Sequence, residues 1–112
     1  MGSALFIAIK EKPADLETFM DGKSLARAWK SLDAAATVLG IPSITKLCNN
    51  AWKNPDKGIP VFEQYLAYVR EHTDQFERPD YVIDDLYDVI RLIREAQRLG
   101  TKWRLLLDYC AQ

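Results

Sequence analysis

The chain has 112 residues, the usual size of a single domain, and we expect one domain over residues 1–112. Hydrophobic residues make up 48% of the chain and charged residues 28%, which excludes a chain that is disordered throughout. The net charge of −1 gives no long-range field that attracts DNA, RNA or an anionic membrane. We therefore expect neither a nucleic acid nor a membrane as a partner.

The first predicted element is a buried strand over residues 4–9. Its residues are apolar on both faces, and the polar stretch 10–13 ends it. The run is too short to cross a bilayer and lacks the basic start of a signal peptide, so we expect a cytoplasmic protein. In the connection that follows, Leu16, Phe19 and Met20 are expected to pack back against the body, because exposed apolar clusters are uncommon.

A strong helix is predicted over residues 24–39, followed by a short helix within residues 43–49. Asp21 or Ser24 can cap the start of the first helix, and Gly40 can end it. Its expected buried stripe consists of Leu25, Ala28, Trp29, Leu32, Ala35, Ala36 and Leu39. The charged residues expected to face solvent are Lys23, Arg27, Lys30 and Asp33.

Residues 49–58 are predicted to form a polar loop that contains Trp52. Two interpretations of Trp52 stay open: a cover for the edge of the core, which is favoured, and an aromatic contact in a binding surface. A second clear helix follows over residues 60–72, with Pro60 suited to its first turn. His72 lies near its end, where a partly positive side chain is favoured, so we expect a surface histidine.

The longest helix is predicted over residues 79–99, and a closing strand over residues 101–110. Gly100 is well placed to turn the chain out of the helix. The expected inner face of the helix consists of Val82, Ile83, Leu86, Val89, Ile90, Ile93, Ala96 and Gln97. Along the strand, residues expected to face the core alternate with outward ones, the inward set being Trp103, Leu105, Leu107 and Tyr109.

The order of these elements predicts an α+β fold. Because the backbone groups of a buried strand need partners, the simplest arrangement pairs the first strand with the last. Three main helices and one short helix then pack on this small sheet. A two-stranded ribbon has two open edges and is marginal alone, so one edge can join two copies across a two-fold axis as a homodimer.

The first half of the longest helix carries four acids, Asp80, Asp84, Asp85 and Asp88. Carboxylates on one helix face can bind a divalent metal or exchange protons. However, acids at the start of a helix and arginines toward its end also complement the helix dipole, and no His or Cys is placed to complete a metal site. We therefore predict no metal, no cofactor and no catalytic residue.

The remaining chemistry-bearing residues are isolated in the sequence. Cys48 and Cys110 match no zinc or redox spacing, and two reduced thiols are favoured over a disulfide. No motif pairs His72 with a nucleophile. Lys102 and Arg104 contribute only a small basic patch, which the acid-rich start of the long helix opposes. These isolated residues argue against enzymatic activity, but the sequence leaves the question open.

Several segments resemble a group of short bacterial hypothetical proteins without an assigned activity. They are GKSLARAWKSLDAAATVLG (22–40), WKNPDKG (52–58), PVFEQYLAYVREH (60–72) and AQRLGTKWRLLLDY (96–109). Outside the apolar stripes, the resemblance is carried by Gly22, Lys23, Arg27, Trp52, Pro55 and Gly58. It implies a strand, a Gly-Lys-x-Leu-x-Arg-Ala helix, an Asn-Pro-x-x-Gly loop, two helices and a closing strand, in a bacterial cytoplasmic protein.

The leading hypothesis is a non-enzymatic domain that binds another protein or a second copy of itself, as an adaptor or as an immunity partner of a toxin. The expected contact face consists of Tyr81, Asp84, Tyr87 and Asp88. The alternative is a small-ligand or enzyme domain with an anion site near Lys23, Arg27 and Trp52, because the two cations share one helix face.

Overall fold

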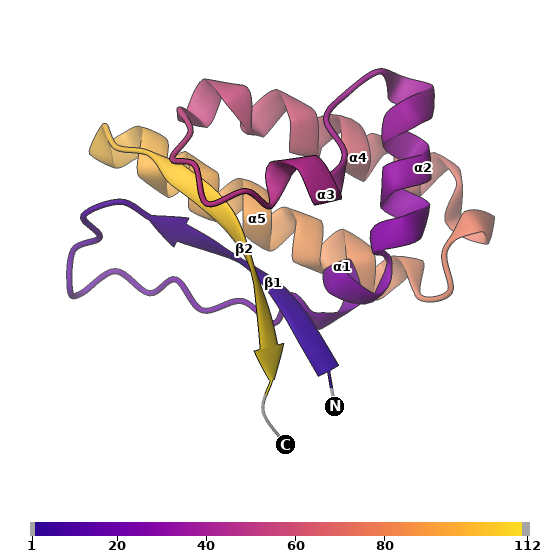
Figure 1. Ribbon diagram of the computed structural model, residues 1–112, viewed down its shortest axis with the longest axis horizontal. Helices are drawn as coiled ribbons and strands as arrows, with labels where there is room; N and C mark the ends of the chain where they lie inside the picture. The colour runs from indigo at the N-terminus through magenta and orange to yellow at the C-terminus, as the bar shows by residue number, and fades with distance from the viewer. Residues whose placement is uncertain (1, 111–112) are drawn as a thin grey trace.

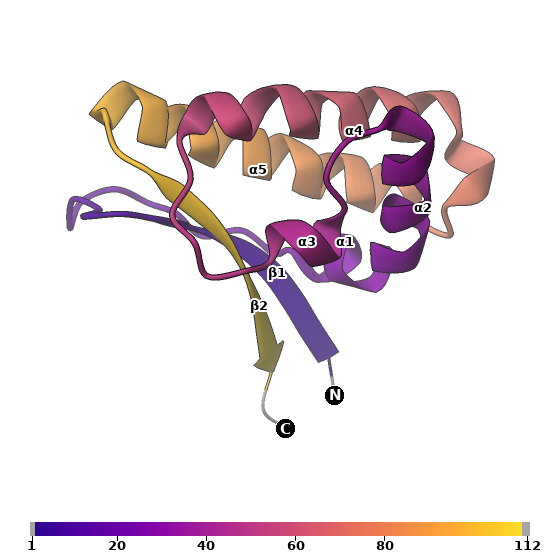
Figure 2. The same cartoon turned by 45° about the horizontal axis from the view of Figure 1, so that its top comes forward.

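The structure is a computed structural model that describes residues 2–110 and the side chains of residues 3–107. Its sheet consists of β1 (Gly2–Ile9) and β2 (Trp103–Cys110), which run antiparallel with Ile9 opposite Trp103. The predicted pairing of the first strand with the last is therefore confirmed. The start of β1 and the end of β2 lie side by side and extend beyond the helices (Figures 1 and 2).

Helices connect the two strands. The α-helices are α1 (Lys23–Arg27), α2 (Trp29–Leu39), α3 (Ile44–Leu47), α4 (Ile59–Glu71) and α5 (Pro79–Leu99), with 3-10 turns η1 (Pro55–Lys57) and η2 (Thr73–Gln75). The long helices α4 and α5 lie side by side over one face of the sheet, as Figure 2 shows. The predicted α+β class, with three main helices and short helical segments, is therefore correct. Within the described chain, every helix is too short or too polar to cross a bilayer.

The core fills the space between the sheet and the long helices. The buried residues of α4 recur at helical spacing and are Phe62, Tyr65, Leu66 and Val69. From β2, Trp103 is fully buried and its ring meets that of Phe62 nearly edge-on, at a centroid distance of 6.0 Å. The indole N–H of Trp103 donates to the carbonyl of Asn54 at 2.9 Å, which fixes the loop before α4 to the start of β2.

The helix predicted over residues 24–39 is divided at Ala28, whose φ of −89° and ψ of 12° lie outside the α-helical range. The two pieces pack against different neighbours: α1 contacts β1 and α5, whereas α2 contacts α3 and α4. One straight helix could not make both sets of contacts. As a result Trp29, which the sequence predicted in the buried stripe, is 45% exposed.

Three other side chains lie outside the core against expectation. Phe19 is 76% exposed although its neighbour Met20 is buried. Gln97 lies on the exposed side of α5. Leu107, near the end of β2, is 42% exposed. The predicted inward position of Tyr109 lies outside the described side chains.

Asp33 is not solvated as predicted but caps α3. Its carboxylate accepts hydrogen bonds from the amide of Ile44 at 2.8 Å and from the hydroxyl of Thr45 at 2.6 Å. Ser43, at the N-cap of the same helix, accepts from the amide of Lys46 at 3.0 Å. The bonds to Asp33 fix the short helix α3 to the middle of α2, whereas the Ser43 bond is local to the start of α3.

Asp85 is buried, although the inner face predicted for the long helix did not include it. It is 5% exposed, and its carboxylate accepts a 2.9 Å hydrogen bond from the amide of Leu25 in α1. The N-cap of α1 is Gly22, which has no side chain for capping, so Asp85 provides the cap from α5 instead of Asp21 or Ser24. Burial raises the pKa of this carboxyl, although its backbone hydrogen bonds oppose the shift.

Candidate functional site

The edge of β2 that faces away from β1 is open over much of its length. The carbonyl of Lys102 accepts from Lys10 on the β1 side, whereas the N–H and C=O of Trp103 bond to Lys53 on the opposite side. Because backbone groups alternate along a strand, those of Leu105 and Leu107 also point away from β1. Within residues 2–110 these groups of Leu105 and Leu107 have no hydrogen-bond partner. They are free to pair with another strand.

An apolar groove of about 640 Å³ lies beside this edge, between the two strands and the helices α1, α2 and α3. It is lined by Ser3, Leu5, Ala26, Trp29, Ile44, Thr45, Cys48, Asn50, Leu105, Leu106 and Leu107. Two of its residues are among the exposed large hydrophobic side chains, Trp29 at 45% and Leu107 at 42%. Contiguous exposed apolar side chains are typical of interaction surfaces.

Trp52 packs against β2. Its ring lies 4.3 Å from the guanidinium carbon of Arg104, and an Nη of Arg104 donates to the carbonyl of Asn50 at 3.3 Å. Lys53 holds the same loop by donating to the carbonyls of Leu47 and Ala51 at 3.2 Å and 3.1 Å. Trp52 thus contacts β2 through Arg104 and is not among the side chains packed against the core, so these contacts favour neither interpretation of Trp52.

The structure does not bring Lys23, Arg27 and Trp52 together as one site. Arg27 lines a small hollow with Arg78, and neither Lys23 nor Trp52 lines it. Lys23 is exposed at the start of α1, while Trp52 lies on Arg104 of β2. The second cation at Arg27 therefore comes from the residue before α5 and not from the same helix.

The predicted contact face on α5 is exposed. Tyr81 is 53% and Tyr87 is 45% exposed, and Asp84 lies between them on the same side of the helix. Arginine side chains already cover both rings, Arg78 over Tyr81 at 5.7 Å and Arg70 over Tyr87 at 5.6 Å. Asp88 forms an ion pair with Arg91 at 3.4 Å. Much of the charge on this face is thus already matched within the chain.

The arginines toward the end of α5 and His72 have local partners. Arg94 pairs with Glu63 at 2.9 Å and Arg98 with Glu95 at 2.8 Å, which lowers the pKa of Glu95. His72 caps the end of α4, and its ring stacks on Tyr68 with 4.0 Å between centroids. Arg94 and Arg98 are thus paired with carboxylates within the chain, and His72 has a structural role at the end of α4.

Cys48 is a free thiol whose pKa is raised, chiefly by burial. A raised pKa disfavours the thiolate, which is the reactive form. The side chain of Cys110, the other half of the disulfide considered above, lies outside the described side chains. Among the described residues, no three His, Cys, Asp or Glu side chains are grouped so that they could hold a metal ion.

Comparisons with protein families, curated proteins and solved structures found no match to this chain. The strongest feature of the candidate site is the open edge at Leu105 and Leu107. The sequence predicted it only as one of the two edges of a ribbon. The sequence signal for this edge is the run Leu105–Leu107. Its middle residue, Leu106, is apolar at a position where the alternation of inward and outward residues along the strand predicts a polar side chain.

Proposed function

We propose that this protein is a non-enzymatic protein–protein interaction domain whose open β2 edge pairs with a second copy of the same chain. The observation that carries this proposal is the set of unpaired N–H and C=O groups of Leu105 and Leu107 beside an apolar groove. Natural proteins usually cover such an edge, because it is a template for adding a strand. The proposal includes the bacterial cytoplasmic setting expected from the sequence.

The spacing of the free groups supports antiparallel self-pairing. A two-fold axis at Leu106 sets Leu105 of one copy opposite Leu107 of the other, and each pair can exchange both hydrogen bonds. The same register sets position 104, an arginine, opposite position 108, an aspartate. Opposite charges at facing positions stabilise a strand pair, whereas like charges destabilise it. This self-complementarity favours a second copy over an unrelated strand.

Burial of apolar side chains supports the same partner. In this pairing the side chain of Leu107 lies beside the partner's Leu105 on the helix-facing side of the sheet. The exposed part of Leu107 would thereby leave water, and the two-stranded ribbon would become a four-stranded sheet. Both changes stabilise the ends of the strands that extend beyond the helices.

The α5 face of Tyr81, Asp84, Tyr87 and Asp88 is the second candidate surface, for a different protein in an adaptor or immunity role. Its exposed tyrosines support this role. Two features make it the weaker candidate: arginines already cover its rings, and Arg91 already pairs with Asp88. A dimer through β2 would leave this face free for such a partner.

Light scattering and sedimentation equilibrium test the proposal. The wild-type protein should have twice the chain mass of 12.8 kDa at submillimolar concentration and dissociate on dilution. Leu107→Lys should give a folded monomer, because two lysines near the two-fold axis repel each other and remain hydrated. Leu107→Pro should do the same, because it removes an N–H that points away from β1 and not one used within the sheet.

Val38→Lys is the matched control, since Val38 is 72% exposed on α2 and the same substitution there should leave the dimer intact. Circular dichroism of each variant verifies that the monomers are folded. A wild-type protein that is monomeric throughout the concentration range contradicts the proposal. So does a dimer that persists in both Leu107 variants.

A further inference from the structure

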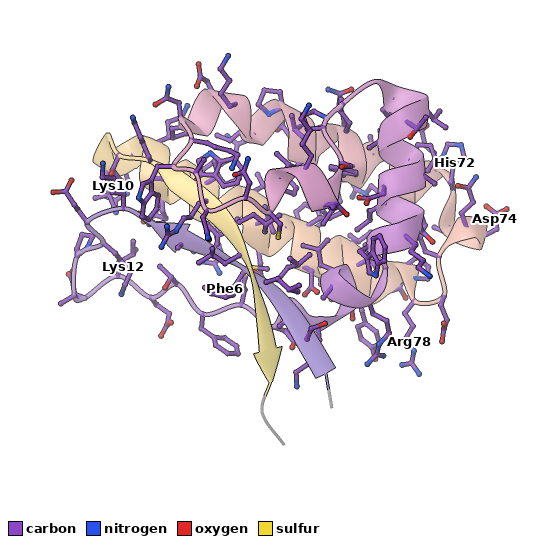
Figure 3. The ribbon with its side chains drawn as sticks, in the orientation of Figure 1. Phe6, Lys10, Lys12, His72, Asp74 and Arg78 are labelled. Atoms are coloured by element: carbon purple, nitrogen blue, oxygen red, sulfur yellow. The ribbon has the colours of Figure 1, made fainter. Side chains whose placement is uncertain are left out.

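A small hollow lies between the junction of α1 with α2 and the segment that leads into α5. Its volume is about 120 Å³. The apolar part of its lining consists of Ala28, Phe76 and Val82, and the polar part of Ser24, Arg27, Ser31, Glu77 and Arg78. Figure 3 shows Arg78 near α1, at the end of the molecule where η2 also lies. The hollow is distinct from the groove beside β2, whose lining is a different set of residues.

The two arginines of this hollow differ from those on the outer side of α5. Arg91, Arg94 and Arg98 each form an ion pair with a carboxylate. Within residues 2–110, neither Arg27 nor Arg78 forms an ion pair, and Glu77 is not within 4.0 Å of a cationic nitrogen although it lines the same hollow. Arg27 and Arg78 therefore line one small concavity without an ion pair; both side chains are exposed, and the guanidinium carbon of Arg78 lies 5.7 Å from the ring centre of Tyr81.

We propose that this hollow binds a phosphate-type oxyanion, either inorganic phosphate or the phosphate of a small monoester. Guanidinium groups bind such anions with paired hydrogen bonds, and the hydroxyls of Ser24 and Ser31 supply two more donors. The volume holds roughly four water molecules, which suits one tetrahedral anion. The apolar lining from Phe76 and Val82 would accommodate a small apolar group attached to the phosphate.

Glu77 sets the strength of this site. A carboxylate beside the bound anion repels it, so the wild-type affinity should be modest. Glu77→Gln removes that repulsion and keeps a side chain of nearly the same size. It should bind the anion more tightly, an effect that a purely structural role of the arginines would not produce.

Titration followed by two-dimensional 15N NMR tests the site. Inorganic phosphate and phenyl phosphate are added separately to the wild-type protein, with sodium chloride used to keep the ionic strength constant. The amide signals of Ser24 and Ser31 should shift and saturate. Arg27→Gln and Arg78→Gln should each weaken binding by about tenfold or more, because each removes charge-assisted hydrogen bonds. Tighter binding of phenyl phosphate identifies a monoester as the ligand, and equal affinities identify inorganic phosphate.

Arg70→Gln is the matched control. Arg70 lies over Tyr87 much as Arg78 lies over Tyr81, but it does not line the hollow, so its loss should leave the affinity unchanged. Shifts that grow linearly without saturation overturn the proposal. Equal weakening by Arg70→Gln and Arg78→Gln also overturns it, because the effect would then reflect only net charge. The site is independent of the β2 edge, so its failure would leave the dimer proposal unaffected.

Discussion

Gly22 adopts a left-handed φ of 67° where the chain passes closely along β1. Its carbonyl accepts hydrogen bonds from the amides of Leu5 at 3.0 Å and Ala26 at 3.1 Å, so it joins the strand to the first turn of α1. A Cβ at this position would overlap the backbone carbonyl of Leu5. Two independent constraints, the dihedral angle and the close approach, therefore both require glycine here.

Gly22→Ala should destabilise the fold by roughly 2–5 kcal/mol, the sum of about 1–2 for the left-handed conformation and about 1–3 for the overlap. Gly40→Ala is the matched control, because Gly40 has a φ of 69° but no atom within 4 Å of an added Cβ. It should lose only about 1–2 kcal/mol. Urea unfolding measures both values, and equal losses would show that the contact with Leu5 is not significant.

The sequence indicated Gly40 and Gly100 as helix ends because each follows a clear helical pattern, and both are the left-handed residues that end α2 and α5. It could not indicate the role of Gly22 in the same way. That role depends on where the backbone of Leu5 lies after folding. A local pattern contains no information on this contact.

At the scale of elements, one carboxylate joins α5 to α1. Asp85 accepts from the amide of Leu25, and it is buried between the two helices. Burial raises its pKa above the ordinary value of 3.8. The folded state therefore favours the protonated carboxyl. The contribution of Asp85 to the free energy of unfolding is fully present below the ordinary pKa and is lost as the pH rises through the folded-state pKa.

The pH dependence of stability should therefore contain a component from Asp85. Relative to Asp85→Asn, which keeps an acceptor for Leu25 but does not ionise, the wild-type protein should lose free energy of unfolding as the pH rises from about 4 toward about 7. Urea unfolding of both proteins across this range measures the difference. A difference that is constant with pH, or that changes in the opposite direction, would contradict this assignment.

Two further variants separate the charge from the hydrogen bond. Asp85→Ala leaves the buried amide of Leu25 without its acceptor and should cost about 1–3 kcal/mol. Asp84→Asn changes an exposed acid on the same turn and should alter stability by no more than about 0.5 kcal/mol.

Most elements were predictable because their periodicity is strong. The apolar stripes of α4 and α5 and the position of both strands follow directly from spacing. The break at Ala28 was not predictable, since its residues all fit a helix and the change of direction comes from packing partners distant in sequence. The same reason explains the burial of Asp85, which lay outside the predicted inner face of the long helix although it contacts α1.

At the scale of the whole molecule, the α+β arrangement followed from the need of each strand for a partner, but the candidate sites did not follow from spacing. Lys23 and Arg27 looked like a pair because they share one helix face, whereas the hollow at Arg27 contains Arg78 from a distant segment. Likewise, the choice between the two edges of the ribbon depends on Gly22 bonding to β1 and on Lys53 reaching only the start of β2.

The central claim is that the outward backbone groups of β2 are paired between two copies. Amide hydrogen exchange at Leu105 and Leu107 tests it most directly, with the amide of Leu106, which points toward β1, as an internal reference. We predict that Leu105 and Leu107 become protected as protein concentration rises, and that Leu105 loses this protection in Leu107→Lys, while Leu106 is protected throughout. Rapid exchange of Leu105 and Leu107 at every concentration, with Leu106 protected, would contradict the account.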